Sequence, residues 1–197
     1  MLLLMYFYLI ANIKILKKVP FMNIFIRSRK EIEYLIDTKT KPVLEPWSLI
    51  SIWNTFRLLT LKNIEIIKSL GCKEFLDLKF GDFTDKEERD ASSESDIILF
   101  NETHASQTIQ FLDSLSTETL IIHCAAGISR SSAIGLFACR YLKLNEQEFL
   151  DNHSHILPNY YILSILNKVS NINKDYASFW ETEEKKELRR KMMSFRT

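Results

Sequence analysis

Short stretches of residues that fit β-strands recur along the chain, and segments with the spacing of amphipathic helices separate them. Residues 23–27 alternate as in a strand, and residues 29–36 then place apolar side chains three and four positions apart. The same two patterns recur further along the chain. They predict strands at 23–27, 47–53, 73–80 and 119–122. They predict helices at 29–36, 61–70, 101–115, 130–142, 145–153 and 159–170.

Three residues stand where helix ends are expected. Ser28 can cap the start of the first helix, Gly71 can end the second, and Pro158 separates the last two. Strands and helices alternate before a final run of helices, which predicts an α/β domain. Its central sheet should be mostly parallel, with four to five strands flanked by helices.

A single domain is expected for most of the chain, because 197 residues bury one core well and would be cramped as two domains. We expect it at residues 22–172, followed by a helix of mixed charge at 173–197. Residues 1–21 begin with an apolar run, but they lack the basic start and cleavage site of a signal peptide. The apolar run itself, residues 1–13, is also short for a membrane span. Three interpretations stay open for residues 1–21: a peripheral apolar helix, a weak membrane anchor, or an extension before a start at Met22.

Charge and cysteine content narrow the classes of function. The formal net charge is +1, so we expect no nucleic-acid partner. Three cysteines, Cys72, Cys124 and Cys139, cannot form a disulfide framework and indicate reduced thiols in a cytoplasmic protein. His153 and His155 have no Cys or carboxylate at ligand spacing, so we expect neither a metal nor another cofactor.

The segment His123-Cys-Ala-Ala-Gly-Ile-Ser-Arg-Ser131 carries the predicted chemistry. It joins a strand to a helix, where backbone N–H groups and the positive helix end can surround a tetrahedral anion. Arg130 can hold two oxygens of that anion, and Gly127 lets the loop bend close to them. The same field favours a thiolate at Cys124, the expected nucleophile. The expected phosphate-binding residues are Ala125, Ala126, Gly127, Ile128, Ser129 and Arg130.

Two neighbours of the nucleophile are expected to support it. Ser131 can donate a hydrogen bond to the thiolate and assist its departure, although a serine also fits there as an ordinary first-turn residue. His123 is expected to brace the loop as a core histidine with hydrogen-bonded ring nitrogens.

A proton donor for the leaving oxygen is expected in the polar segment after the third strand. Asp82 directly follows that strand and is the preferred candidate. Asp85 is the alternative. Asp90 and Asp96 lie in the same region, and each also fits as an ordinary surface residue.

Together these residues resemble the dual-specificity and bacterial tyrosine phosphatase superfamily of cysteine-based protein phosphatases. The loop sequence is similar to the phosphate loop of the dual-specificity branch, and Phe80-Gly-Asp-Phe83 resembles the general-acid segment. Leu157-Pro-Asn-Tyr-Tyr-Ile-Leu-Ser-Ile-Leu166 resembles the helix that follows the active site. The resemblance covers about residues 23–171 and implies a dual-specificity-phosphatase-like fold. It also implies that Asn159 steadies the phosphate loop, with a plain helix start as the alternative.

The activity that this resemblance implies is hydrolysis of phosphotyrosine in a protein or peptide through a phosphocysteine intermediate. The recognition loops of the large tyrosine phosphatases are not visible, which favours a shallow site that also accepts phosphoserine and phosphothreonine. The phosphate loop contains no lysine, which makes inositol lipids less suitable substrates. Two alternatives stay open. An inactive phosphate-binding module would usually have lost Cys124 or Arg130, and a rhodanese- or arsenate-reductase-like thiol enzyme would not need Asp82.

Overall fold

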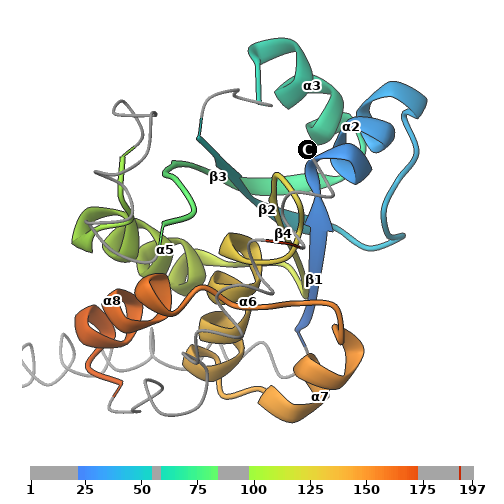
Figure 1. Ribbon diagram of the computed structural model, residues 1–197. Helices are drawn as coiled ribbons and strands as arrows, with labels where there is room; N and C mark the ends of the chain where they lie inside the picture. The colour runs from blue at the N-terminus through green and yellow to red at the C-terminus, as the bar shows by residue number, and fades with distance from the viewer. Residues whose placement is uncertain (1–21, 55–58, 84–97, 173–190, 192–197) are drawn as a thin grey trace, which may run out of the picture.

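The computed structural model of the chain describes residues 22–54, 59–83, 98–172 and 191 (Figure 1). The elements in chain order are β1 (Asn23–Ser28), α2 (Arg29–Thr38), β2 (Trp47–Trp53), α3 (Leu61–Ser69), β3 (Cys72–Lys79), α5 (Glu102–Ser114), β4 (Thr119–Cys124), α6 (Arg130–Tyr141), α7 (Glu146–Asn152) and α8 (Tyr160–Ser170). Each predicted strand and helix within residues 22–172 is present, with ends shifted by at most two residues. The segment 1–21 and almost all of 173–197 lie outside the described residues.

The four strands form one parallel sheet in the order β1-β4-β2-β3. Parallel neighbours need crossover connections, and the helices between the strands supply them. The predicted α/β fold class, with a parallel sheet flanked by helices, is therefore confirmed. Among the described residues no helix is both long and apolar enough to cross a membrane.

The helices cover both faces of the sheet (Figure 1). Helices α2 and α3 pack on one face, and α5, α6 and α8 pack on the other. Strand β2 is buried on both sides because it lies inside the sheet. Its residues Trp47 and Leu49 join the smaller cluster under α2 and α3, whereas Ile50 and Ile52 join the larger cluster on the opposite face.

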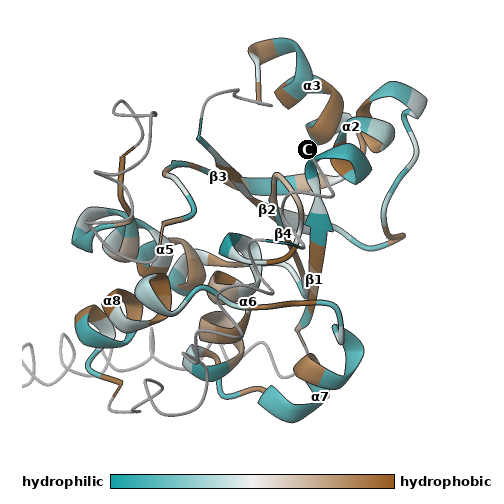
Figure 2. Cartoon of the chain, viewed as in Figure 1, coloured by the Kyte–Doolittle hydropathy of each residue, from teal (hydrophilic) through white to brown (hydrophobic). Residues whose placement is uncertain are grey.

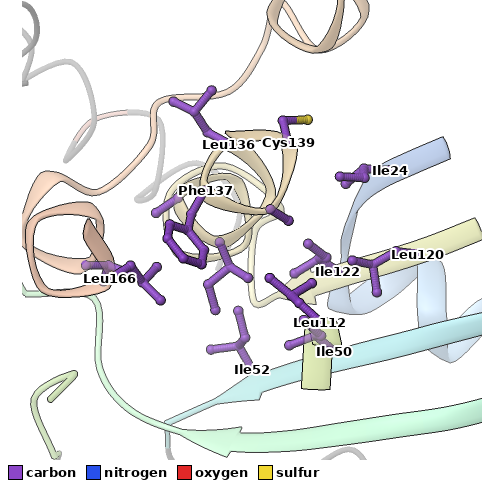
Figure 3. Packing of buried hydrophobic residues seen from close by; sticks show 14 of the residues in the cluster. Ile24, Ile50, Ile52, Leu112, Leu120, Ile122, Leu136, Phe137, Cys139 and Leu166 are labelled. Atoms are coloured by element: carbon purple, nitrogen blue, oxygen red, sulfur yellow. The ribbon is translucent and has the colours of Figure 1, made fainter. Parts of the chain in front are cut away.

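Helix α6 lies at the centre of the larger cluster (Figure 3). Its residues Leu136 and Phe137 are almost fully buried and belong to the same cluster as Leu112 of α5, Leu166 of α8 and Ile122 of β4. Phe137 points toward Leu166 (Figure 3). The distribution of hydropathy agrees with this central position of α6, because the outer helices α5, α7 and α8 carry polar residues on one side (Figure 2). A buried helix with fixed neighbours gives the loop at its N-terminus a rigid support.

The strand register brings two loops together at the carboxyl ends of β1 and β4. Strands β1 and β4 pair so that Arg27 lies beside His123 and Ser28 beside Cys124. Both strands end there, and the chain enters α2 after Ser28 and the predicted phosphate loop after Cys124. In parallel sheets, ligands usually bind outside the carboxyl ends of the strands, and this edge is where the predicted site lies.

Candidate active site

The predicted phosphate loop joins the end of β4 to the start of α6, as the sequence pattern indicated. Gly127 donates its backbone N–H to the Sγ atom of Cys124, at 3.3 Å. The Oγ atom of Ser131, in the first turn of α6, lies 3.2 Å from the same sulfur. The loop therefore folds around the thiol of Cys124, and the predicted contact with Ser131 is present.

Helix α6 begins without a side-chain cap, which distinguishes it from the other described helices. The N-cap side chains of α2, α3, α5, α7 and α8 each accept a hydrogen bond from the first turn of their helix. At α6 the N-cap is Ser129, and its side chain makes no such bond. The first N–H groups of this helix are thus left for another acceptor, and its positive end suits an anion.

Arg130 is buried at the start of α6, with 3% of its surface exposed. Its Nη1 atom donates to the carbonyl oxygen of Phe80 at 3.1 Å, and its Nε atom has no hydrogen-bond partner among the described residues. It forms no salt bridge within residues 22–54, 59–83 and 98–172. A buried guanidinium without a carboxylate partner is costly, and a bound oxyanion would offset that cost.

Gly127 has a positive φ of 71°, a conformation that other residues rarely adopt. A Cβ atom at this position would lie 2.8 Å from the backbone carbon of Arg27 and from the backbone nitrogen of Ser28. The predicted role of Gly127 is to let the loop bend close to a bound anion. In the structure its close approach is to the backbone between β1 and α2.

The predicted acid, Asp82, lies just beyond β3 and is tied to the phosphate loop. Its Oδ1 atom accepts hydrogen bonds from the Oγ of Ser129, at 2.7 Å, and from the Nδ2 of Asn159, at 2.8 Å. Ser129 is predicted to bind phosphate, and its side-chain contact with Asp82 was not expected from the sequence. The alternative acids Asp85, Asp90 and Asp96 lie outside the described residues.

Asn159 connects three parts of the site. Its Oδ1 caps α8 by accepting the N–H of Ile162, and its Nδ2 also donates to the carbonyl of Phe83 at 3.1 Å. Its own N–H donates to the carbonyl of Ser129 at 3.2 Å. Asn159 is thus both a helix cap and a bridge between the loop and the Asp82 segment. The two interpretations of this residue, a plain helix start and a residue that steadies the loop, therefore hold together.

His123 is 1% exposed and lies directly before Cys124. Its Nε2 atom lies 2.8 Å from the Oγ of Ser51, whereas Nδ1 makes no hydrogen bond of ordinary geometry to a described residue. The prediction of hydrogen-bonded ring nitrogens is therefore correct for one of the two. Burial lowers the pKa of His123 to about 3, so the ring is neutral and fits a bracing role. Ser51 was missed, although a serine inside the apolar strand β2 was a visible signal.

Cys72 and Cys139 are buried away from the loop, as expected of structural thiols. Burial raises the pKa of both thiols to about 12, with nearby Glu74 adding to the effect at Cys72 and Glu146 at Cys139. No group of three or more metal-ligating side chains occurs in the described part of the chain.

Comparisons with known proteins give little help in assigning this site. No family model matches the sequence, and no curated protein matches it. A solved structure, "Crystal structure of Tk-PTP in the active form", superposes over 90% of this chain and 95% of its own, with 13% identity and a TM-score of 0.40.

The geometry of the site suits chemistry on a tetrahedral oxyanion. The N–H of Gly127 and the hydroxyl of Ser131 contact the sulfur of Cys124. The same loop leads into an uncapped helix start at which the Arg130 guanidinium is buried. Groups of this kind bind negatively charged oxygens and stabilise the charge that develops when one of them is displaced.

Proposed function

We propose that this protein is a cysteine-dependent phosphatase that hydrolyses phosphotyrosine in proteins or peptides, and also phosphoserine or phosphothreonine. The observation that carries the proposal is the position of Cys124. Its sulfur lies inside the loop, 3.3 Å from the N–H nitrogen of Gly127, and the loop leads directly into the buried Arg130. A phosphate held by the same N–H groups would have the sulfur beneath it, aligned for in-line attack.

In the first step the thiolate of Cys124 attacks phosphorus and forms an S–P bond. The bond from phosphorus to the substrate oxygen breaks, and the leaving oxygen takes a proton from the Asp82 carboxyl group. Arg130 and the loop N–H groups hold the three other phosphate oxygens and stabilise their charge. The product is the dephosphorylated residue and a phosphocysteine.

In the second step a water molecule attacks the phosphocysteine. The Asp82 carboxylate takes a proton from that water, the S–P bond breaks, and inorganic phosphate and the Cys124 thiolate are released. Ser131 supports this step because its hydroxyl, 3.2 Å from Sγ, can donate a hydrogen bond to the departing thiolate. Neither step needs a metal ion or another cofactor.

The decisive experiment is turnover of para-nitrophenyl phosphate by the wild type and by Cys124→Ser. The wild type should release phosphate, and the variant should show no turnover while it still binds phosphate or vanadate. Trapping of a phosphoenzyme in the wild type by rapid acid quench would locate the intermediate on Cys124. Activity that survives in Cys124→Ser would overturn the proposal, and so would a wild type that binds phosphate without hydrolysing its esters.

A further inference from the structure

A groove of about 440 Å³ opens beside the phosphate loop, on the side of β1. Its lining comes from three separate segments: the end of β1 with the start of α2, the first residues after the nucleophile, and the connection between α7 and α8. The lining residues that matter for its charge are Arg27, Lys30, Glu31 and His155, and Ala125 and Ala126 form the border with the phosphate loop.

The start of α2 is fixed directly against the phosphate loop. The N–H of Arg29 donates to the carbonyl of Ala125 at 3.1 Å. Gly127 lies against the backbone of Arg27 and Ser28 so closely that a Cβ atom would not fit between them. A substrate whose phosphate sits in the loop must therefore pass the side chains of this first helical turn if it extends toward β1.

Positive charge dominates this turn. Lys30 is exposed and forms no salt bridge to any residue in the described ranges. Arg27 approaches Glu31 with Nε and Oε1 3.7 Å apart, which is longer than a hydrogen bond, and both side chains are about half exposed. Such exposed pairs are weak, so an incoming anion can compete for Arg27.

Glu31, the acidic residue of the groove, already has partners. Its Oε2 accepts hydrogen bonds from the N–H of Ser28, at 2.6 Å, and from the Ser28 hydroxyl, at 2.7 Å. It completes the capping box of α2 and is held at the positive end of that helix. One of its oxygens is therefore engaged at the helix start, and the two basic side chains of the lining, Arg27 and Lys30, outnumber this one carboxylate.

We propose that this groove binds a second anionic group of a peptide substrate, a carboxylate or phosphate on a residue next to the one being dephosphorylated. Lys30 and Arg27 are the specificity-determining residues. The inference rests on the proposed function and deepens it, because it names the substrate class as phosphopeptides with a neighbouring negative charge.

The test compares kcat/KM for three phosphotyrosine peptides that differ at the flanking positions. One carries neutral residues, the second acidic residues and the third a second phosphorylated residue. The wild type should prefer both charged peptides over the neutral one by about tenfold, and the preference should shrink as salt rises from 0.05 to 0.5 M. Comparison of the two charged peptides shows whether carboxylate or phosphate is the better ligand.

Lys30→Glu should remove most of this preference. Lys30→Ala should reduce the logarithm of the kcat/KM ratio between charged and neutral peptides by about half. An acidic residue in the first turn of a helix is favourable, so the Glu variant should fold. Lys73→Glu is the matched control. Lys73 is an exposed lysine near the start of β3, at the amino ends of the parallel strands and thus at the end of the sheet opposite to the groove. It should keep the full preference.

Equal rates for the three peptides in the wild type would overturn the inference, and so would equal preferences in Lys30→Glu and Lys73→Glu. Both results leave the proposed function standing as long as the wild type hydrolyses para-nitrophenyl phosphate. A wild type that hydrolyses neither the small ester nor any peptide overturns the proposed function itself, and the inference with it.

Discussion

The hydroxyl of Ser129 donates a 2.7 Å hydrogen bond to the carboxylate of Asp82. This bond joins the phosphate loop to a segment 47 residues earlier in the chain. It also explains why Ser129 does not cap α6, since its side chain is turned to Asp82 instead. One hydrogen bond therefore positions the proposed proton donor and leaves the start of α6 without a side-chain cap.

Asp82→Asn tests the proton donor directly. An asparagine can keep an oxygen where Oδ1 accepts its two hydrogen bonds, so the loop should keep its shape while the exchangeable carboxyl proton is lost. We expect kcat for para-nitrophenyl phosphate to fall by about 10²–10⁴, the usual contribution of a general acid. Asp85→Asn is the comparison. If it cripples turnover while Asp82→Asn is silent, the acid has been assigned to the wrong residue.

Ser129→Ala tests whether positioning of Asp82 matters. The variant loses the bond to Oδ1, and kcat for an ester with a poor leaving group should fall by about 10- to 100-fold, because small misplacements of a catalytic group are costly. An ester whose leaving group needs no protonation should be much less affected. Ser129→Thr keeps the hydroxyl and should restore most of the rate. Equal losses for both esters would indicate general damage to the loop instead.

Cysteine labelling distinguishes Cys124 from Cys72 and Cys139, although all three side chains are buried. Because burial raises the pKa of Cys72 and Cys139 to about 12, almost none of either thiol is ionised at pH 7.5. Iodoacetate should therefore label Cys124 first, and phosphate or vanadate should slow the reaction by occupying the loop. Peptide mapping of the labelled protein gives the result. Preferential labelling of Cys72 or Cys139 in the folded protein would contradict the proposed nucleophile.

Gly127→Ala should damage both stability and activity. The added Cβ would lie within 3 Å of the backbone of Arg27 and Ser28, and the residue would keep an unfavourable positive φ. We expect a loss of about 2–4 kcal/mol in the free energy of unfolding, measured with urea. Gly71→Ala is a matched control: its φ is 104°, but its Cβ would meet Trp47 at an ordinary 3.7 Å. A loss no larger than that of the control would argue against the backbone clash.

The sequence predicted those features that depend on local patterns. Periodicity was enough to place the strands and helices, and a nine-residue motif was enough to place Cys124 at the end of β4 and Arg130 at the start of α6. Ser28 was predicted to cap a helix, and a helix start was the alternative interpretation of Asn159, because capping residues act within three positions of themselves.

The contacts that the sequence did not predict join residues far apart in the chain. The bond between His123 and Ser51, and the contact of Gly127 with Arg27, both depend on which strands are neighbours and in which register. Periodicity identifies the strands but not the order β1-β4-β2-β3. The Ser129–Asp82 bond likewise depends on how the segment after β3 approaches the loop.

His123 makes the stability of the protein depend on pH. Its folded-state pKa of about 3 lies well below the usual value of 6.5, because burial disfavours the charged ring. Between those two values the unfolded chain binds a proton that the native protein does not. The free energy of unfolding therefore falls as the pH drops below about 6.5, by up to about 1.4 kcal/mol for each pH unit.

His123→Asn should weaken this dependence, because an asparagine does not titrate and can still reach Ser51 with a polar atom. We expect the wild type to lose up to about 2 kcal/mol more stability than the variant between pH 7 and pH 5, as measured by urea denaturation. His104, whose pKa burial also lowers, is present in both proteins, so its contribution cancels in the difference. Parallel stability curves for the two proteins would mean that His123 is not held as a neutral ring, and its bracing role would have to be abandoned.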